Sequence, residues 1–190
     1  ALKLAKQTPF VDANRIAIVG HSMGGTFGPL VAAREPVKGV VAIATLSKTW
    51  IEYMLENTRR QSLLAGADPA AVDTEMQRLS AVCHYMFNEG LSAEELAKQK
   101  PDLAPAVRDL APDGKTFSGV GIPFFQQLAK HNVMAAWKDS KAKVLAMWGE
   151  NDFVSGRDDH EFIAQAVNGW RPGTAVFKAI PKSDHGFNET

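Results

Sequence analysis

Cysteine is nearly absent from this sequence, because Cys83 is its only cysteine. A single thiol cannot form an internal disulfide, which excludes a disulfide-stapled scaffold without deciding between an oxidising and a reducing compartment. A chain of 190 residues that is 45% apolar can bury a core large enough to fold without disulfides or metals. We expect Cys83 to be a small buried residue on a helix.

An excess of charge of either sign is also lacking, since 21 basic residues balance 21 acidic ones. The sequence therefore has no basic surface for a phosphate backbone, and we expect no nucleic-acid partner. Its longest apolar runs, such as residues 39–46, are far shorter than the ~20 residues of a membrane-spanning helix, so no membrane span is expected. The spacings H-x-x-x-H and C-x-x-C are absent, and we expect neither a metal nor another cofactor.

The first residues show no pattern typical of a signal peptide, and the chain begins with Ala1 rather than methionine. We expect the true N-terminus to lie further upstream. The sequence therefore leaves the compartment open between cytoplasm and secretion.

Short apolar runs without alternation predict buried strands of a parallel sheet. A helical pattern follows the first run at once and leads to the second, which indicates a β-α-β unit with a right-handed crossover. The predicted strands are residues 16–19, 40–46, 143–148 and 175–180, with helices near 23–34 and 158–170. Together they predict an α/β fold with a mostly parallel sheet.

The segment between the second and third strands does not alternate in this way. It carries helical stretches separated by Gly and Pro clusters, and its length of about ninety residues is too great for a simple loop. We therefore predict a helical insertion at 48–138 within one α/β core formed by 1–47 and 139–190. The predicted helices of the insertion lie near residues 50–65, 69–88, 92–100 and 123–137.

A G-x-S-x-G motif, centred on Ser22, lies between the first predicted strand and its helix. Such a serine occupies a tight, strained turn, and we expect Gly20 and Gly24 to leave room for the two arms of the turn. Gly25 is expected to let the helix approach the sheet. The backbone N–H of Met23, at the start of the helix, is the expected donor to an oxygen anion beside Ser22.

A serine hydroxyl becomes a strong nucleophile only when a base removes its proton and a carboxylate orients that base. Asp152 directly follows the third predicted strand, in the sequence GEND, and His185 follows the fourth, in the sequence SDHG. Because the carboxyl ends of parallel strands meet at one edge of a sheet, we expect both residues to lie near Ser22.

Other acids and histidines offer alternatives to this choice. Glu150, Asp158 and Asp159 lie close to Asp152 in the sequence and are also consistent with solvated residues of a turn or of a first helical turn. The remaining histidines are His21, His84, His131 and His160. Of these, His21 is expected to pack beside the site. An alternative for Ser22 itself is a capping serine at an ordinary strand-to-helix junction.

These motifs resemble the C-terminal part of an α/β-hydrolase of the serine esterase and lipase kind. The resemblance covers nearly the whole chain and implies a three-layer α/β-hydrolase fold with a helical cap. It also implies that Ser22 is the nucleophile, His185 the general base and then acid, and Asp152 the orienting carboxylate, with no cofactor. Family members have several strands before the serine turn, and their second oxyanion donor comes from a loop there. We therefore expect the site in this chain to be incomplete.

Our leading hypothesis is a serine hydrolase that cleaves small-molecule carboxylic esters through an acyl-enzyme. A peptidase, a thioesterase or an acyltransferase would use the same three residues, and the sequence does not separate them. Dehalogenases and epoxide hydrolases of this family need an aspartate at the position of Ser22, so the serine argues against both. A competing hypothesis is a non-catalytic fragment or binding module, because the strand at 16–19 would form an exposed apolar edge. We expect the chain to self-associate through that edge or through the cap.

Aromatic residues and methionines recur in the predicted cap, where they fit either an acyl pocket or the core of the cap itself. They are Trp50, Tyr53, Met54, Met86, Phe124, Phe125 and Trp137. From this set we select Trp50, together with His21, as candidate substrate contacts.

Overall fold

The computed structural model describes residues 1–190. The chain forms two compact units: a first unit of Ala1–Lys48 and Asn132–Thr190, and a second unit of Thr49–His131. The predicted insertion ran to residue 138, whereas the second unit ends at His131, because the helix that follows packs in the first unit.

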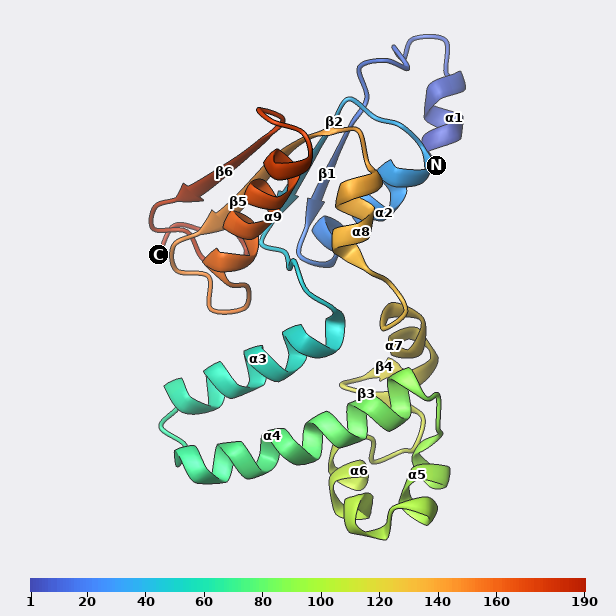
Figure 1. Cartoon of the computed structure of the whole chain (residues 1–190), viewed down its shortest axis with the longest axis vertical. Coiled ribbons are helices and arrows are strands. Elements are labelled where there is room, and N and C mark those ends of the chain that lie inside the picture. The colour runs from blue at the N-terminus through green and yellow to red at the C-terminus, as the bar shows by residue number, and fades with distance from the viewer. The chain divides into compact units, whose positions relative to one another are not determined.

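The first unit contains a four-stranded, wholly parallel sheet in the order β1-β2-β5-β6 (Figure 1). The predicted parallel sheet and β-α-β unit are therefore confirmed. The strands are β1 (Ala17–His21), β2 (Gly39–Ile43), β5 (Lys143–Gly149) and β6 (Ala175–Ile180).

Three helices of the first unit, α2, α8 and α9, lie on one face of this sheet (Figure 1). Gly28 brings α2 close to the sheet, because a Cβ there would lie 3.1 Å from a Val40 methyl group. The helices of this unit are α1 (Leu2–Gln7), α2 (Met23–Arg34), α8 (Val133–Asp139) and α9 (Arg157–Trp170).

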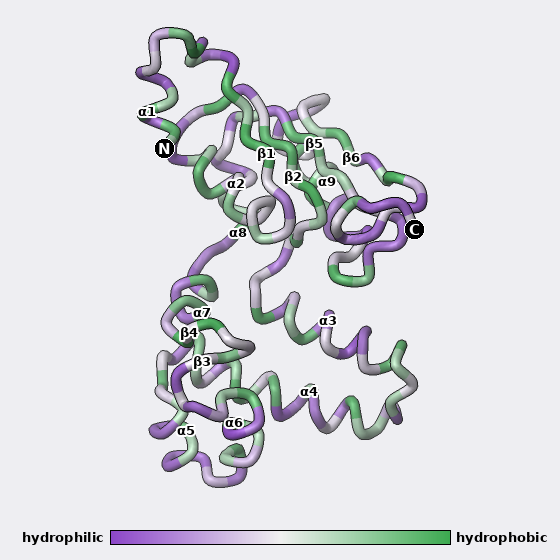
Figure 2. The backbone as a smooth tube through the Cα atoms, turned by 180° about the vertical axis from the view of Figure 1, so that it is seen from behind, coloured by the Kyte–Doolittle hydropathy of each residue, from purple (hydrophilic) through white to green (hydrophobic).

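Successive residues of a strand point to opposite faces, and the two faces of this sheet differ in burial. Val40, Ala42, Val144 and Ala146 are at most 4% exposed beneath the helices. On the other face Val19, Val41, Leu145 and Val176 stand in register across all four strands, and Val19 and Val176 are 69% and 59% exposed. Figure 2 shows the hydrophobic character of β1, β2 and β5 from the back. The full burial expected from the apolar runs is not found on this face.

The second unit is mostly helical, and α3, α4 and α5 each begin at a residue whose side chain caps the helix. Thr49 and Ser92 each form a capping box, and the Asp68 side chain accepts a hydrogen bond from the backbone of Ala71. The elements are α3 (Trp50–Leu64), α4 (Pro69–Cys83), a π-helical turn (His84–Asn88), α5 (Ala93–Gln99), a 3-10 turn (Pro101–Leu103), α6 (Ala104–Leu110), β3 (Thr116–Phe117), β4 (Val120–Gly121) and α7 (Ile122–Leu128).

The predicted helix at 123–137 is wrong as one element, because the chain forms α7 and α8 with a break between them. The Asn132 side chain accepts a hydrogen bond from the backbone of Ala135 at 2.9 Å and so caps α8. The sequence prediction also lacked α6 and the β3–β4 hairpin. None of the helices has the length and apolar character that a membrane span requires.

The core of the second unit contains three phenylalanines, Phe87, Phe117 and Phe125, whose ring centres are 5.3 to 5.4 Å apart. Cys83 is fully buried at the end of α4, as predicted, and burial raises the pKa of its thiol to about 12.

Candidate catalytic site

Ser22 is the single residue between β1 and α2, and its backbone is strained. Its φ of 54° and ψ of −121° lie in a region that residues with a side chain rarely adopt. A Cβ at Gly20 would lie 2.2 Å from the carbonyl oxygen of Gly24, so the turn requires glycine at position 20. A Cβ at Gly25 would lie 2.7 Å from that of Thr45. A Cβ at Gly24 would meet no atom, so the clearance expected from Gly24 is not needed.

The serine turn is fixed to the neighbouring strand. The backbone N–H of Ser22 donates to the carbonyl of Ile43, the last residue of β2, at 2.8 Å. Met23 opens α2, where the first N–H groups of a helix have no intrahelical acceptors. Its N–H therefore donates no hydrogen bond within the helix, and it lies at the position beside Ser22.

The structure brings Ser22, His185 and Asp152 together. His185 Nε2 lies 3.2 Å from Ser22 Oγ, and His185 Nδ1 lies 3.0 and 3.1 Å from the two oxygens of Asp152. An ionised carboxylate only accepts, so the proton of the neutral ring is on Nδ1 and Nε2 is left to accept from the serine hydroxyl.

The Asp152 side chain is fully buried and accepts several hydrogen bonds within its own turn. Val154 N–H donates at 2.8 Å, and Ser155 donates from its backbone at 2.9 Å and from its hydroxyl at 2.5 Å. Burial raises the pKa of Asp152, but the hydrogen bonds from Ser155, His185 and Val154 outweigh it and hold the pKa below its usual value. Sequence reasoning missed Ser155, although a serine three residues after an aspartate is a common turn signal.

The loop that carries His185 packs directly on the turn that carries Asp152. Asn151 N–H donates to the carbonyl of Ser183 at 2.9 Å, and a Cβ at Gly149 would lie 2.4 Å from the same oxygen. Asp184 braces the loop by accepting from the backbone N–H of Asn188 at 2.9 Å. This bond and the Asn188 side chain lower the pKa of Asp184.

His21 lies beside the site, as expected. Its Nε2 is 2.6 Å from the backbone carbonyl oxygen of His185, and the two imidazole rings are 5.1 Å apart. Because a carbonyl only accepts, His21 donates this hydrogen bond and anchors the histidine loop to the serine turn.

The competing residues have other partners. His160 is fully buried and bonded to Thr45 and Gly156, and Asp159 is bonded to Ser47. His84 lies in the second unit, 3.0 Å from Glu89.

Trp50 and His131 also belong to the second unit. Trp50 lines a pocket of about 280 Å³ there. No group of His, Cys, Asp or Glu side chains in the chain is arranged to hold a metal ion.

Comparison with known proteins places the chain in a family. The sequence profile of the alpha/beta hydrolase family matches residues 2–190. Among solved structures, Est1E from Butyrivibrio proteoclasticus is 17% identical, with a TM-score of 0.55 over 98% of this chain and 59% of its own. A puromycin-hydrolyzing peptidase from Mycobacterium tuberculosis is 16% identical, with a TM-score of 0.54 over 98% of this chain and 21% of its own.

The chain spans 59% to 61% of the length of the first solved structures that it matches. No curated protein matches it. Because the family profile covers almost every residue, this chain belongs to the alpha/beta hydrolase family.

Proposed function

We propose that the chain carries the catalytic residues of a serine hydrolase that cleaves carboxylic esters. The observation that supports this proposal is the continuous hydrogen-bonded series Ser22 Oγ, His185 Nε2, His185 Nδ1 and Asp152, with separations of 3.2 and 3.0 Å. A serine on a strained turn at a helix start, with a base and a carboxylate in line, is the arrangement that acyl transfer requires.

In the proposed reaction, Ser22 Oγ attacks the acyl carbon while His185 Nε2 takes the hydroxyl proton. The carbonyl oxygen becomes an anion that the Met23 N–H stabilises, and Asp152 remains ionised beside the new imidazolium. Collapse of this intermediate breaks the ester bond, and the departing alcohol takes the proton from His185. Water then repeats the sequence on the acyl-enzyme, which releases the carboxylic acid and restores Ser22.

A pocket of the second unit is suited to an acyl group. Its walls come from α3, α4, α6, α7 and the β3–β4 hairpin, and its volume of about 280 Å³ is near the lower end of small-ligand pockets. Apolar side chains dominate the walls. They include Trp50, Tyr53, Met54, Leu79, Leu110, Phe117 and Phe125.

Trp50 has a further property that supports a role in binding. Its indole Nε1–H is buried and has no hydrogen-bond partner, and a buried unpaired donor costs about 1–3 kcal/mol. A ligand with an oxygen acceptor on an apolar body would satisfy that donor. We therefore propose Trp50 as a substrate contact within the second unit and, separately, His21, beside His185, as a contact near the reacting carbonyl in the first unit.

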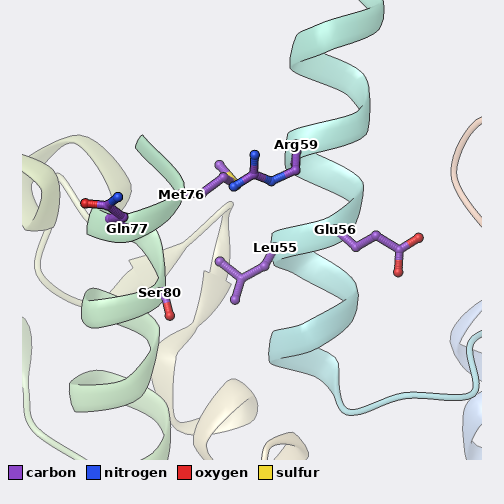
Figure 3. Close-up of a pocket in the computed structure, with 6 residues that line it drawn as sticks. All are labelled: Leu55, Glu56, Arg59, Met76, Gln77 and Ser80. Carbon is purple, nitrogen blue, oxygen red and sulfur yellow. The ribbon is translucent and has the colours of Figure 1, made fainter. Parts of the chain in front are cut away.

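A larger cavity of the second unit is less suitable for an acyl group. It measures about 680 Å³ and lies between α3 and α4 (Figure 3). Figure 3 shows Leu55 on α3 pointing toward α4, whereas Glu56 points away. Its other lining residues are mainly polar, namely Arg59, Gln77 and Ser80 beside Met76.

Labelling by a fluorophosphonate probe tests the proposed function, because the probe phosphonylates only activated serines. We expect the probe to label wild-type protein at Ser22 and to leave Ser22→Ala unlabelled. His185→Ala should be labelled at least 100-fold more slowly. Ser80→Ala, which removes an exposed serine of α4, is the matched control and should be labelled at the wild-type rate. Absence of labelling in wild-type protein would overturn the proposal in favour of a binding module.

Turnover distinguishes a peptidase from an esterase. We expect p-nitrophenyl esters to be hydrolysed in a Ser22-dependent manner and the matching anilides to be much poorer substrates. Faster cleavage of the anilides would assign a peptidase instead.

A further inference from the structure

Two buried polar side chains at the start of α9 are not used by the proposed reaction. Asp159 is 2% exposed and His160 is fully buried. Burying such groups is costly unless every polar atom is hydrogen-bonded, so their partners show what they hold in place.

His160 bridges two backbone groups. Its Nδ1 lies 2.8 Å from the carbonyl oxygen of Gly156, and its Nε2 lies 2.9 Å from the backbone nitrogen of Thr45. The carbonyl can only accept and the N–H can only donate. The ring is therefore neutral, with its proton on Nδ1, and a second proton would face the N–H of Thr45.

Asp159 binds the same segment further along. Its Oδ1 accepts from Ser47 N at 2.7 Å and from Ser47 Oγ at 2.5 Å, and Lys48 Nζ lies 3.4 Å from its Oδ2. The start of α9 thus holds residues 45–48, which follow β2.

This segment supports the serine turn from behind. Thr45 Oγ1 lies 3.1 Å from Thr26 Oγ1 on α2, and Thr45 Cβ occupies the space that a side chain at Gly25 would need. Between β2 and Thr45 lies Ala44, whose φ of 51° is unfavourable for a residue with a side chain. Residues 45–48 therefore leave the sheet through a strained residue. Their position depends on hydrogen bonds from outside the sheet.

At its other end the His160 bridge reaches the turn of the catalytic acid. Gly156, which accepts from His160, directly follows Ser155, and Ser155 holds Asp152 with two hydrogen bonds. The imidazole of His160 is thus the shared link between the Asp152 turn and the segment behind Ser22.

We propose that His160 is a positioning residue, which fixes the Asp152 turn relative to the serine turn through Gly156 and Thr45, with Asp159 as a second anchor. This inference rests on the proposed function of Ser22, His185 and Asp152. Displacing a catalytic group by about 1 Å costs on the order of 100-fold in rate, so loss of the link should lower kcat with little change in KM.

Two amide variants separate the two ends of the bridge. In His160→Gln the amide oxygen reaches the position of Nε2 and accepts from Thr45, whereas in His160→Asn the amide nitrogen replaces Nδ1 and donates to Gly156. Both variants lose the ring at the same helical position. Because each variant cuts the bridge at one end, we expect kcat for p-nitrophenyl acetate and the rate of Ser22 labelling to fall on the order of 100-fold in both.

Hydrogen exchange of the Thr45 amide gives a readout that needs no catalysis. Its protection should persist in His160→Gln and be lost in His160→Asn. If wild-type protein is not labelled at Ser22, the proposed function fails, and the positioning role fails with it. If wild-type protein is labelled but the two folded variants both react at the wild-type rate, only the inference about His160 fails. If His160→Asn does not fold, a His160→Gln variant that loses Thr45 protection yet reacts at the wild-type rate overturns the inference.

Discussion

Ser155 illustrates how a single hydroxyl can tune the catalytic acid. Its Oγ lies 2.5 Å from Asp152 Oδ2, and with its own N–H it helps to hold the pKa of Asp152 below the usual value. A carboxyl whose folded-state pKa is lowered contributes stability above its unfolded pKa of about 4, and this contribution is lost as the pH falls through the folded pKa.

Ser155→Ala should therefore raise the pKa of Asp152 and lower the free energy of unfolding at pH 7 by about 1–3 kcal/mol. The stability lost through Asp152 on acidification should be smaller than in wild-type protein and complete at a higher pH, because the folded-state pKa then lies closer to the unfolded value. Urea unfolding between pH 3 and 7 measures both effects, with Ser80→Ala as control. Identical pH profiles for Ser155→Ala and wild-type protein would contradict this account of the Asp152 turn.

His160 also has a lowered pKa in the folded chain, but for a different reason. Burial lowers its pKa, although the hydrogen bond to Gly156 and the charges of Asp159, Asp152 and Asp158 act to raise it. The unfolded chain binds a proton near pH 6.5, whereas the folded chain resists protonation, so stability falls as the pH drops below about 6.5. The slope from this group is at most about 1.4 kcal/mol per pH unit.

His160→Gln should flatten the stability profile between pH 5 and 6.5, because glutamine does not titrate. Thermal unfolding at closely spaced pH values measures this change. Replacing the exposed His84 by glutamine is the matched control. An unchanged slope in His160→Gln would mean that another group produces the acid sensitivity.

The phenylalanine cluster is the clearest stabilising feature among the elements of the second unit. Phe87, on the π-helical turn after α4, contacts Phe117 of β3 and Phe125 of α7, so it joins this turn to two later elements of the unit. The Gln126 side chain donates to the carbonyl of Met86 in the same turn at 3.0 Å, which satisfies a group that the irregular helix leaves open.

Phe87→Ala should lower the free energy of unfolding by about 3–5 kcal/mol, because it removes a fully buried ring and leaves a cavity. Phe87→Leu should cost less, since most of the volume is kept. Chemical denaturation measures the difference, and Phe153→Ala, which truncates a 60% exposed ring, is the control. Equal effects of Phe87→Ala and Phe153→Ala would show that the cluster is not part of a cooperative core.

The elements that the sequence predicted well are those with strong local signals. The apolar runs marked all four strands of the sheet, and the glycines around Ser22 marked the serine turn. Asp152 and His185 were found because each directly follows such a strand. The break before α8 was missed because Asn132 is a weak signal without a neighbouring Gly or Pro. The roles of Ser155 and His160 depend on hydrogen-bond geometry, and Thr45 lies 115 residues from His160.

For the whole molecule, the sheet is the feature with the largest consequence for association. β1 is an edge strand, and on the face away from the helices Val19 is 69% exposed at the end of an apolar row that crosses all four strands. Such an edge is a template for pairing with another chain.

We expect the isolated chain to self-associate through β1, and Val19→Lys to shift it toward the monomer because a charge on the edge opposes pairing. Light scattering across a concentration series measures the shift. Leu64→Lys introduces the same charge at a 75% exposed residue of the second unit and should leave association unchanged. A monodisperse wild-type monomer would contradict this expectation.

The distance along the chain between Ser22 and His185 also affects when the site can form during synthesis. The two residues are separated by 163 positions, and the base and its carboxylate both follow the second unit. At about 5–20 residues per second, a ribosome needs on the order of ten to thirty seconds to pass from the serine to the histidine. Throughout that interval the serine of the nascent chain lacks its base and its carboxylate, so the proposed chemistry would begin only after the last strand of the sheet has been made.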